Sequence, residues 1–361
     1  MNKDFTNPGQ VGSGVRRLWP LWAASFGSTA VLAAPIDQCV AIDDDAQRLV
    51  CYDRAAGRPL ALPLPAASGP DIDRAERSGS PALPKVDAAG ESSIRPLLST
   101  VWELDAVDKR GTFNMLPHRL TYMLPVRYTT RVNALPSSPT PGHSVDNALP
   151  IDSTEAKFQF SFKFKAWQNM LGDNGDLWFG YTQQSHWQMY SGAVSSPFRE
   201  TNYEPELIVS LRTEAELLGW RWRALNLGLV HQSNGRPLPL SRSWNRVYAQ
   251  FGIERGNFTV LARPWLRFRE KAESDDNPDI GSYYGSGDLR LAYAHNGHLF
   301  SALGRYSLSG KRGGLQLDWA YPISGSMKGY LQFTSGYGES LVDYNHAQNT
   351  IGLGVLFVPW Q

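Results

Sequence analysis

The sequence contains few cysteines, little net charge and, after its first forty or so residues, no long hydrophobic run. With 2 cysteines and a formal net charge of +1 in 361 residues, neither a cysteine-rich metal site nor an attraction for nucleic acid is expected. No later apolar run approaches the roughly 18 residues that a membrane-spanning helix requires, which excludes such helices. Aromatic residues, in contrast, reach 12% and glycines number 33. This composition, with many short alternating runs, is typical of a transmembrane β-barrel.

The beginning of the chain has the features of an exported protein. Arg16 and Arg17 precede an apolar stretch that ends in small residues at Ala34, which predicts a secretory signal peptide. A buried helix is the alternative, but a proline and a glycine interrupt the stretch. Cys39 and Cys51 form an even pair in an exported chain and predict a disulfide that closes a short loop.

The composition also predicts how the rest of the chain is divided. Residues 55–95 are rich in Pro, Ala, Gly and Ser and are expected to form a flexible linker. We therefore expect a signal peptide over residues 1–34, a periplasmic segment with the cysteine loop and linker over 35–110, and a β-barrel over 111–361.

From about residue 119 onward, apolar and polar residues alternate in short runs. In the clearest run, phenylalanines at 158, 160, 162 and 164 alternate with polar residues at 159, 161, 163 and 165. Since successive side chains of a strand point to opposite faces, each run predicts one apolar and one polar face. Charges of both signs recur on the polar faces, at Lys163, Glu206, Arg212, Arg263, Asp288, Arg290 and Asp318.

Twelve such runs predict an all-β fold, a 12-stranded antiparallel transmembrane β-barrel with an N-terminal extension. Its apolar faces would meet lipid, and its interior would be filled by salt bridges and hydrogen bonds rather than left as a wide pore. A soluble β-sandwich has the same alternation but buries the apolar face, and it is the alternative.

One strand of this series carries unusual polar residues on its apolar face. Leu227 and Leu229 share that face, and counting on by two places His231 and Ser233 there as well. At a rise of about 3.3 Å per residue, these two side chains start roughly 7 Å apart, a gap that an imidazole can span.

The next strand supplies a third polar group. A second alternating run opens at Asn245, and a hairpin centred near Leu238 places Asn245 opposite His231. Opposed residues on one face have Cβ atoms roughly 5 Å apart. A serine, a histidine and an amide on one face fit a nucleophile, its base and a group that orients the base. The alternative is that these residues form only the polar rim of a strand.

Several motifs around this hairpin carry a family resemblance. Residues 231–236 (HQSNGR) and 241–246 (SRSWNR), together with 195–205, 275–279 and 335–341, resemble the core of the outer-membrane phospholipase A family. The resemblance covers roughly residues 115 to 361. It implies that Ser233 is the nucleophile, His231 the general base and Asn245 the residue that fixes the imidazole. The backbone N–H of Gly235 is a candidate donor to the oxyanion.

The resemblance also implies a calcium ion. The family's calcium positions fall on the Ser241 side chain, the Arg236 carbonyl and Ser195, which is donated across a dimer, and a second, weaker site falls on Asp276. Leu238 stands where family members often carry an acidic residue. The alternative is that the serines cap turns and that Asp276 lies in a solvated loop.

The function implied is a calcium-dependent outer-membrane phospholipase A. It would hydrolyse acyl esters of phospholipids and lysophospholipids at both glycerol positions and be activated by homodimerisation, with Gln183 on the lipid-facing side at a dimer contact. A rim glutamine in the headgroup layer is the alternative for Gln183. The competing functions are a non-enzymatic outer-membrane barrel, such as a porin or structural protein, and a soluble exported esterase.

Overall fold

The computed structural model describes residues 39–56, 97–192, 195, 197–325 and 327–358. The chain forms two compact units, which divide between residues 87 and 88. The first contains helix α1 (Asp45–Ala55) and a disulfide between Cys39 and Cys51, as predicted. The predicted signal peptide and nearly all of the predicted linker lie outside the described residues.

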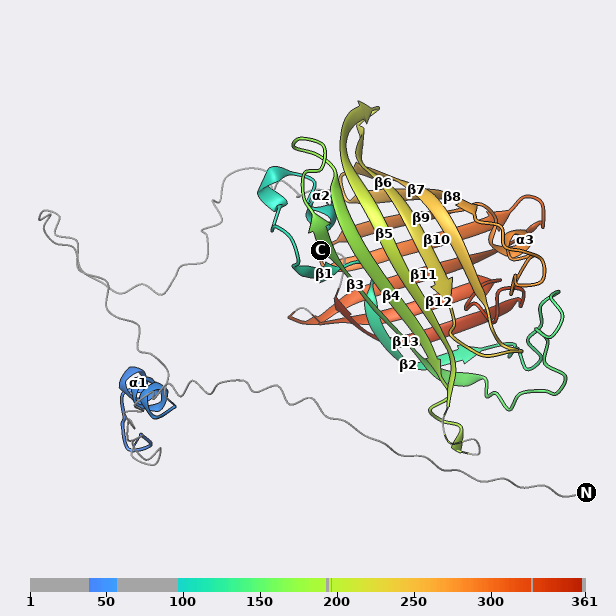
Figure 1. Cartoon of the computed structure of the whole chain (residues 1–361), viewed down its shortest axis with the longest axis horizontal. Helices are drawn as coiled ribbons and strands as arrows, with labels where there is room; N and C mark the ends of the chain where they lie inside the picture. The colour runs from blue at the N-terminus through green and yellow to red at the C-terminus, as the bar shows by residue number, and fades with distance from the viewer. Residues whose placement is uncertain (1–38, 57–96, 193–194, 196, 326, 359–361) are drawn as a thin grey trace, which may run out of the picture. The chain divides into compact units, whose positions relative to one another are not determined.

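The second unit is built on a closed antiparallel sheet. Each strand pairs with its neighbours in sequence, and β13 pairs with β2, so twelve strands form a barrel without free edges. Figure 1 shows these strands tilted around a common axis. The strands are β2 (Thr121–Thr129), β3 (Thr154–Trp167), β4 (Asp176–Trp187), β5 (Phe198–Leu217), β6 (Trp220–Ser233), β7 (Ser243–Arg255), β8 (Phe258–Arg267), β9 (Gly287–His295), β10 (His298–Ser307), β11 (Arg312–Ser324), β12 (Met327–Gly336) and β13 (Gln348–Val358).

The alternation places apolar side chains outside and charged ones inside. Leu227 and Leu229 on β6 are 45% and 50% exposed, whereas Lys163 on β3 and Glu206 on β5 are 0% and 2% exposed. A β-sandwich would show the opposite burial, so the barrel prediction is confirmed. The outward leucines, isoleucines and aromatic residues form the apolar belt that a bilayer requires.

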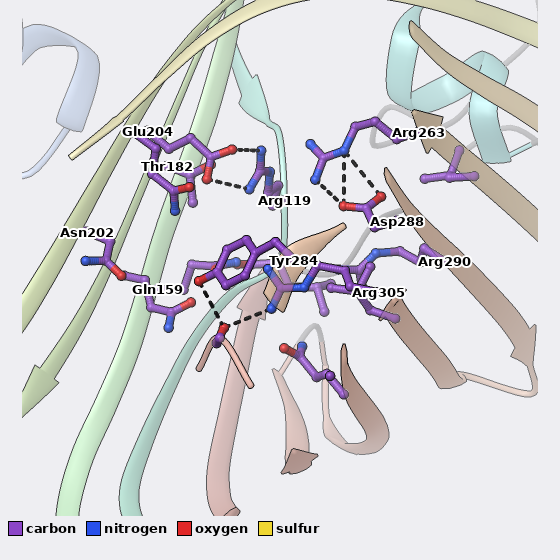
Figure 2. A pocket seen from close by; sticks show the side chains of 18 of the residues that line it. Arg119, Gln159, Thr182, Asn202, Glu204, Arg263, Tyr284, Asp288, Arg290 and Arg305 are labelled. Carbon is purple, nitrogen blue, oxygen red and sulfur yellow. Dashed lines mark hydrogen bonds and ion pairs between the residues drawn. The ribbon is translucent and has the colours of Figure 1, made fainter. Parts of the chain in front are cut away.

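Ion pairs fill the barrel interior. Arg119 contacts Glu204 at 2.7 Å, and Arg263 contacts Asp288 at 2.6 Å. Figure 2 shows both pairs facing the same pocket, a cavity of about 180 Å³ that is also lined by Tyr284. The interior is therefore a packed polar network rather than a wide pore, as the charges on the polar faces predicted.

A segment that precedes the first barrel strand packs into one end of the barrel. It comprises helix α2 (Leu97–Trp102), the short helix η2 (Ala106–Asp108) and strand β1 (Met115–Pro117), which pairs with β3. The N–H of Leu98 donates to Glu254 at 2.6 Å, and the Trp102 ring lies 3.4 Å from Nζ of Lys163. Residues 97–110, which the sequence analysis assigned to the periplasmic segment, thus pack with the barrel. No helix in the described part of the chain is long and apolar enough to cross a membrane.

The two ends of the barrel differ in the length of their connections. At one end β5–β6 and β7–β8 are joined by two-residue turns, at 218–219 and 256–257. The other end carries longer connections, over residues 130–153, 188–197, 234–242, 268–286 (with helix α3, Gly281–Tyr284) and 337–347. Figure 1 shows α2 and α3 at opposite ends. Because short turns are typical of the periplasmic side and long loops of the outer side, this difference predicts that the 234–242 connection faces outward from the cell.

Candidate active site

The β6–β7 hairpin brings the three predicted side chains into register. His231 pairs with Asn245 and Ser233 with Ser243, which centres the hairpin at residue 238 as predicted. His231 Nδ1 donates to Asn245 Oδ1 at 2.8 Å. Because an amide oxygen only accepts, this hydrogen bond puts the ring proton on Nδ1 and leaves Nε2 as the basic nitrogen.

All three side chains lie on the outer face of the barrel. His231 is exposed, and Ser233 and Asn245 are partly exposed, on the face that also carries Leu227 and Leu229. Ser233 follows His231 by two residues on the same strand, so the serine and the imidazole project in the same direction. The trio is thus open to molecules in the surrounding bilayer rather than to the barrel interior.

The turn after Ser233 is organised by Asn234, a buried side chain that the sequence analysis did not single out. Its Nδ2 donates to both carboxylate oxygens of Glu200 at 3.2 Å and to the Leu240 carbonyl at 2.8 Å. Its Oδ1 accepts from the backbone N–H of Arg242 at 3.0 Å. An asparagine directly after a strand is a known turn signal, and this one holds the loop that follows the serine in place.

Gly235 occupies a backbone position that favours glycine. Its φ is +59°, in the left-handed region, and a Cβ there would lie 3.3 Å from the Tyr203 ring. The residue is exposed and lies two residues after Ser233.

A cluster of oxygen atoms lies beside the hairpin. The Asp276 carboxylate accepts from the Ser241 hydroxyl at 2.9 Å and from the Ser243 hydroxyl at 3.0 Å. His143 Nε2 lies 3.0 Å from the other oxygen of Asp276. Two of the predicted calcium ligands, Ser241 and Asp276, are therefore in direct contact, although the sequence analysis assigned them to separate sites. The Ser243 hydroxyl was not predicted as part of this cluster, because its partner Asp276 lies in the β8–β9 connection, 33 residues further along the chain.

The other two predicted calcium ligands lie at the same end of the barrel. The Arg236 guanidinium donates to the Phe198 carbonyl at 3.4 Å, which ties the turn to the start of β5. Ser195 is exposed in the connection just before that strand, with a φ of 58°. Leu238, at the apex of the turn, is 60% exposed.

Comparison with known proteins shows the family of the chain. The model of the Phospholipase A1 family matches residues 98–357. A protein of Neisseria meningitidis serogroup B, provisionally named phospholipase A1, is 40% identical over 364 residues, covering 93% of this chain and 92% of the relative.

Solved structures show the same barrel. Outer membrane phospholipase A from Escherichia coli matches with a TM-score of 0.65 and 36% identity, covering 73% of this chain and 98% of that one. A variant of that enzyme described as an active-site mutant has alanine in place of an asparagine. The Salmonella typhi outer membrane phospholipase, solved as a dimer with bound calcium, matches with a TM-score of 0.64 and 36% identity, covering 70% of this chain and 96% of that one.

The closed twelve-stranded barrel, the family match over most of the chain and the likeness to these enzymes together identify the chain as a bacterial outer-membrane phospholipase of the phospholipase A1 family.

Proposed function

We propose that the protein hydrolyses the acyl ester bonds of phospholipids and lysophospholipids, at both glycerol positions, through Ser233, His231 and Asn245. The observation that carries the proposal is the 2.8 Å hydrogen bond from His231 to Asn245 on the outward face, with Ser233 two residues further along that face. A lipid ester at the bilayer surface can reach this face without leaving the membrane.

In this mechanism Ser233 is the nucleophile. Its Oγ attacks the ester carbonyl while His231 Nε2 takes the hydroxyl proton, and the same proton then passes to the departing alcohol. The resulting acyl-enzyme is hydrolysed by water, which His231 activates in the same way. Asn245 holds the ring through the Nδ1 proton, so that Nε2 faces the serine during both steps. Because an amide carries no charge, it stabilises the imidazolium less than a carboxylate would.

The tetrahedral intermediate requires donors for its oxyanion. The Gly235 N–H, two residues after the nucleophile and exposed in the turn, is the backbone donor that we assign to this role. The absence of a side chain at Gly235 leaves that amide accessible to the substrate.

The oxygen cluster beside the hairpin fits a calcium ion. Carboxylate, hydroxyl and carbonyl oxygens are the ligands that calcium prefers, and the Asp276 carboxylate already lies within 3.0 Å of the Ser241 and Ser243 hydroxyls. We propose that Ser241, the Arg236 carbonyl and Asp276 hold the ion, with Ser195 supplied by a second copy of the chain. When bound, calcium would add positive charge that favours the oxyanion.

We further propose that the active form is a homodimer that pairs through the outer face around Gln183. This side chain lies on an outward face in a polar row, accepting from the Tyr181 hydroxyl at 3.2 Å and donating to Ser185 at 3.3 Å. Exposing polar side chains to the hydrocarbon of the bilayer costs free energy, and hydrogen bonds to polar groups of a second subunit would reduce that cost. Sedimentation in detergent, with and without calcium and a substrate analogue, tests this assembly: Gln183→Leu should weaken the dimer.

The direct test of the proposed function is Ser233→Ala. We expect the variant to retain the barrel, seen as the heat-dependent change in electrophoretic mobility, and to lose phospholipid hydrolysis. Chelation of calcium should suppress hydrolysis by the unaltered protein. The proposal would be contradicted if the variant hydrolysed phospholipid as fast as the unaltered protein. It would also be contradicted if hydrolysis by the unaltered protein were insensitive to chelator.

A further inference from the structure

A carboxylate lies directly behind the residue that orients the imidazole. Asn245 Nδ2 donates to Glu270 Oε1 at 3.2 Å, while Asn245 Oδ1 accepts from His231 Nδ1 at 2.8 Å. The three side chains therefore form a chain of hydrogen bonds that ends in a negative charge. Glu270 comes from the β8–β9 connection, not from either strand of the hairpin.

The loop is held so that this carboxylate reaches Asn245. The Phe268 N–H donates to the Asn245 carbonyl at 2.9 Å, which extends the β7–β8 pairing by one step. Arg267 contacts Asp275 at 2.5 Å and closes the base of the loop. A turn in which the Ser274 N–H donates to the Lys271 carbonyl at 2.9 Å follows Glu270 directly. The residues before and after Glu270 are thus held in place by hydrogen bonds and an ion pair. The Glu270 side chain itself is partly buried.

The chemistry of an amide explains why the carboxylate matters. An asparagine side chain can present either its oxygen or its NH₂ group to a histidine, and the two orientations select opposite tautomers of the ring. If the NH₂ group faced Nδ1, the proton would sit on Nε2, and that nitrogen could not accept the proton of Ser233. An ionised carboxylate only accepts hydrogen bonds, so Glu270 requires the NH₂ group of Asn245 to face it.

We propose that Glu270 is a positioning residue for the hydrolysis: it fixes the Asn245 amide with its oxygen toward His231 and adds the negative charge that the amide lacks. This inference rests on the proposed roles of Ser233, His231 and Asn245. The carboxylate does not touch the substrate or accept a proton. It favours the productive tautomer before the reaction, and its charge stabilises the imidazolium that forms during the reaction.

The first test compares Glu270→Gln with a control in the same loop. Glutamine keeps the size of the side chain but removes its charge, and it can donate as well as accept, so the Asn245 amide is free to turn over. We expect kcat to fall about fivefold or more, as when a charged hydrogen-bond partner becomes neutral, with KM unchanged. Glu273→Gln makes the same change at an exposed position of the same loop and should leave kcat unaltered.

A second background separates positioning from a merely structural role. In Asn245→Asp the carboxylate beside His231 has two acceptor oxygens, so turning it over does not change the tautomer of the imidazole. The same carboxylate is repelled by the negative charge of Glu270. Adding Glu270→Gln to that background should therefore maintain or raise kcat, whereas the same change lowers kcat in the natural background. Such a disappearance or reversal of the effect does not arise if Glu270 only maintains the fold of the loop.

The outcomes are distinct from those that test the proposed function. The inference is overturned if Glu270→Gln retains kcat within twofold, or if it lowers kcat equally in both backgrounds. It is supported by a fall in the natural background that disappears or reverses with Asn245→Asp. If the unaltered protein fails to hydrolyse phospholipid, or if Ser233→Ala keeps full activity, the proposed function itself fails, whatever the Glu270 variants do.

Discussion

Replacing Asn245 with alanine removes the acceptor of the 2.8 Å hydrogen bond from His231 Nδ1 and leaves the strand pairing of β7 intact. In the transition state this bond is made to an imidazolium, and hydrogen bonds to charged groups contribute about 1.5 to 3 kcal/mol. At about 1.4 kcal/mol per factor of ten, kcat should fall about 10- to 100-fold, with the lower part favoured because His231 is exposed. Replacing the aspartate of a serine protease triad with asparagine selects the wrong histidine tautomer and costs about 10⁴-fold. Alanine at position 245 selects neither tautomer, so a smaller loss is expected.

The assay is the hydrolysis of a phospholipid in mixed micelles at saturating calcium, with kcat and KM determined separately. Asn257→Ala is the matched control, because Asn257 also contacts a histidine, His295 Nδ1 at 3.3 Å, but in the two-residue turn between β7 and β8. It should leave kcat unchanged. If Asn245→Ala were as inactive as Ser233→Ala, or fully active, the orienting role would be refuted.

Two further predictions concern the loops around the site. Ser241→Ala and Asp276→Asn should each raise the calcium concentration for half-maximal activity about tenfold, because each removes a hard oxygen ligand; an unchanged calcium titration would contradict that assignment. Burial raises the pKa of Asp343, but Arg199 at 2.9 Å and the Ser340 hydroxyl outweigh burial and hold that pKa below its ordinary value. The stabilisation is therefore present above the unfolded pKa of about 3.9 and is lost as pH falls through the lower folded value. Asp343→Asn should remove this acid-dependent part, measured as the folded fraction by heat-dependent mobility between about pH 6 and about pH 2; identical acid profiles would contradict it.

Local periodicity explains why the strands and the central hairpin were predictable. A strand alternates with a period of two whatever it packs against, so counting from Leu227 places His231 and Ser233 on the outer face. The hairpin register follows from the same count because the two strands are consecutive in sequence and the alternation on each side of residues 234–242 fixes which residues face outward. The pairing of His231 with Asn245 is therefore predictable from the sequence.

Contacts made by loops could not be predicted in this way. Asp276 and Glu270 reach the hairpin from the connection between β8 and β9, and no repeat in the sequence links them to Ser241 or Asn245. The packing of α2 inside the barrel also depends on long-range contacts, such as that between Leu98 and Glu254. Such contacts depend on the tertiary packing of distant segments, whereas the alternation of a strand predicts only the face on which a residue lies.

The most direct measurement is the location of a covalent sulfonyl adduct. The protein in detergent with calcium is treated with a serine-directed sulfonyl fluoride until hydrolysis stops, and the modified residue is found by mass spectrometry. The mechanism predicts one adduct, on Ser233, that is absent from Ser233→Ala and slow to form in Asn245→Ala. Inactivation with the adduct on a different serine, or continued hydrolysis by protein fully labelled at Ser233, would contradict the claim that the outward-facing trio performs the reaction.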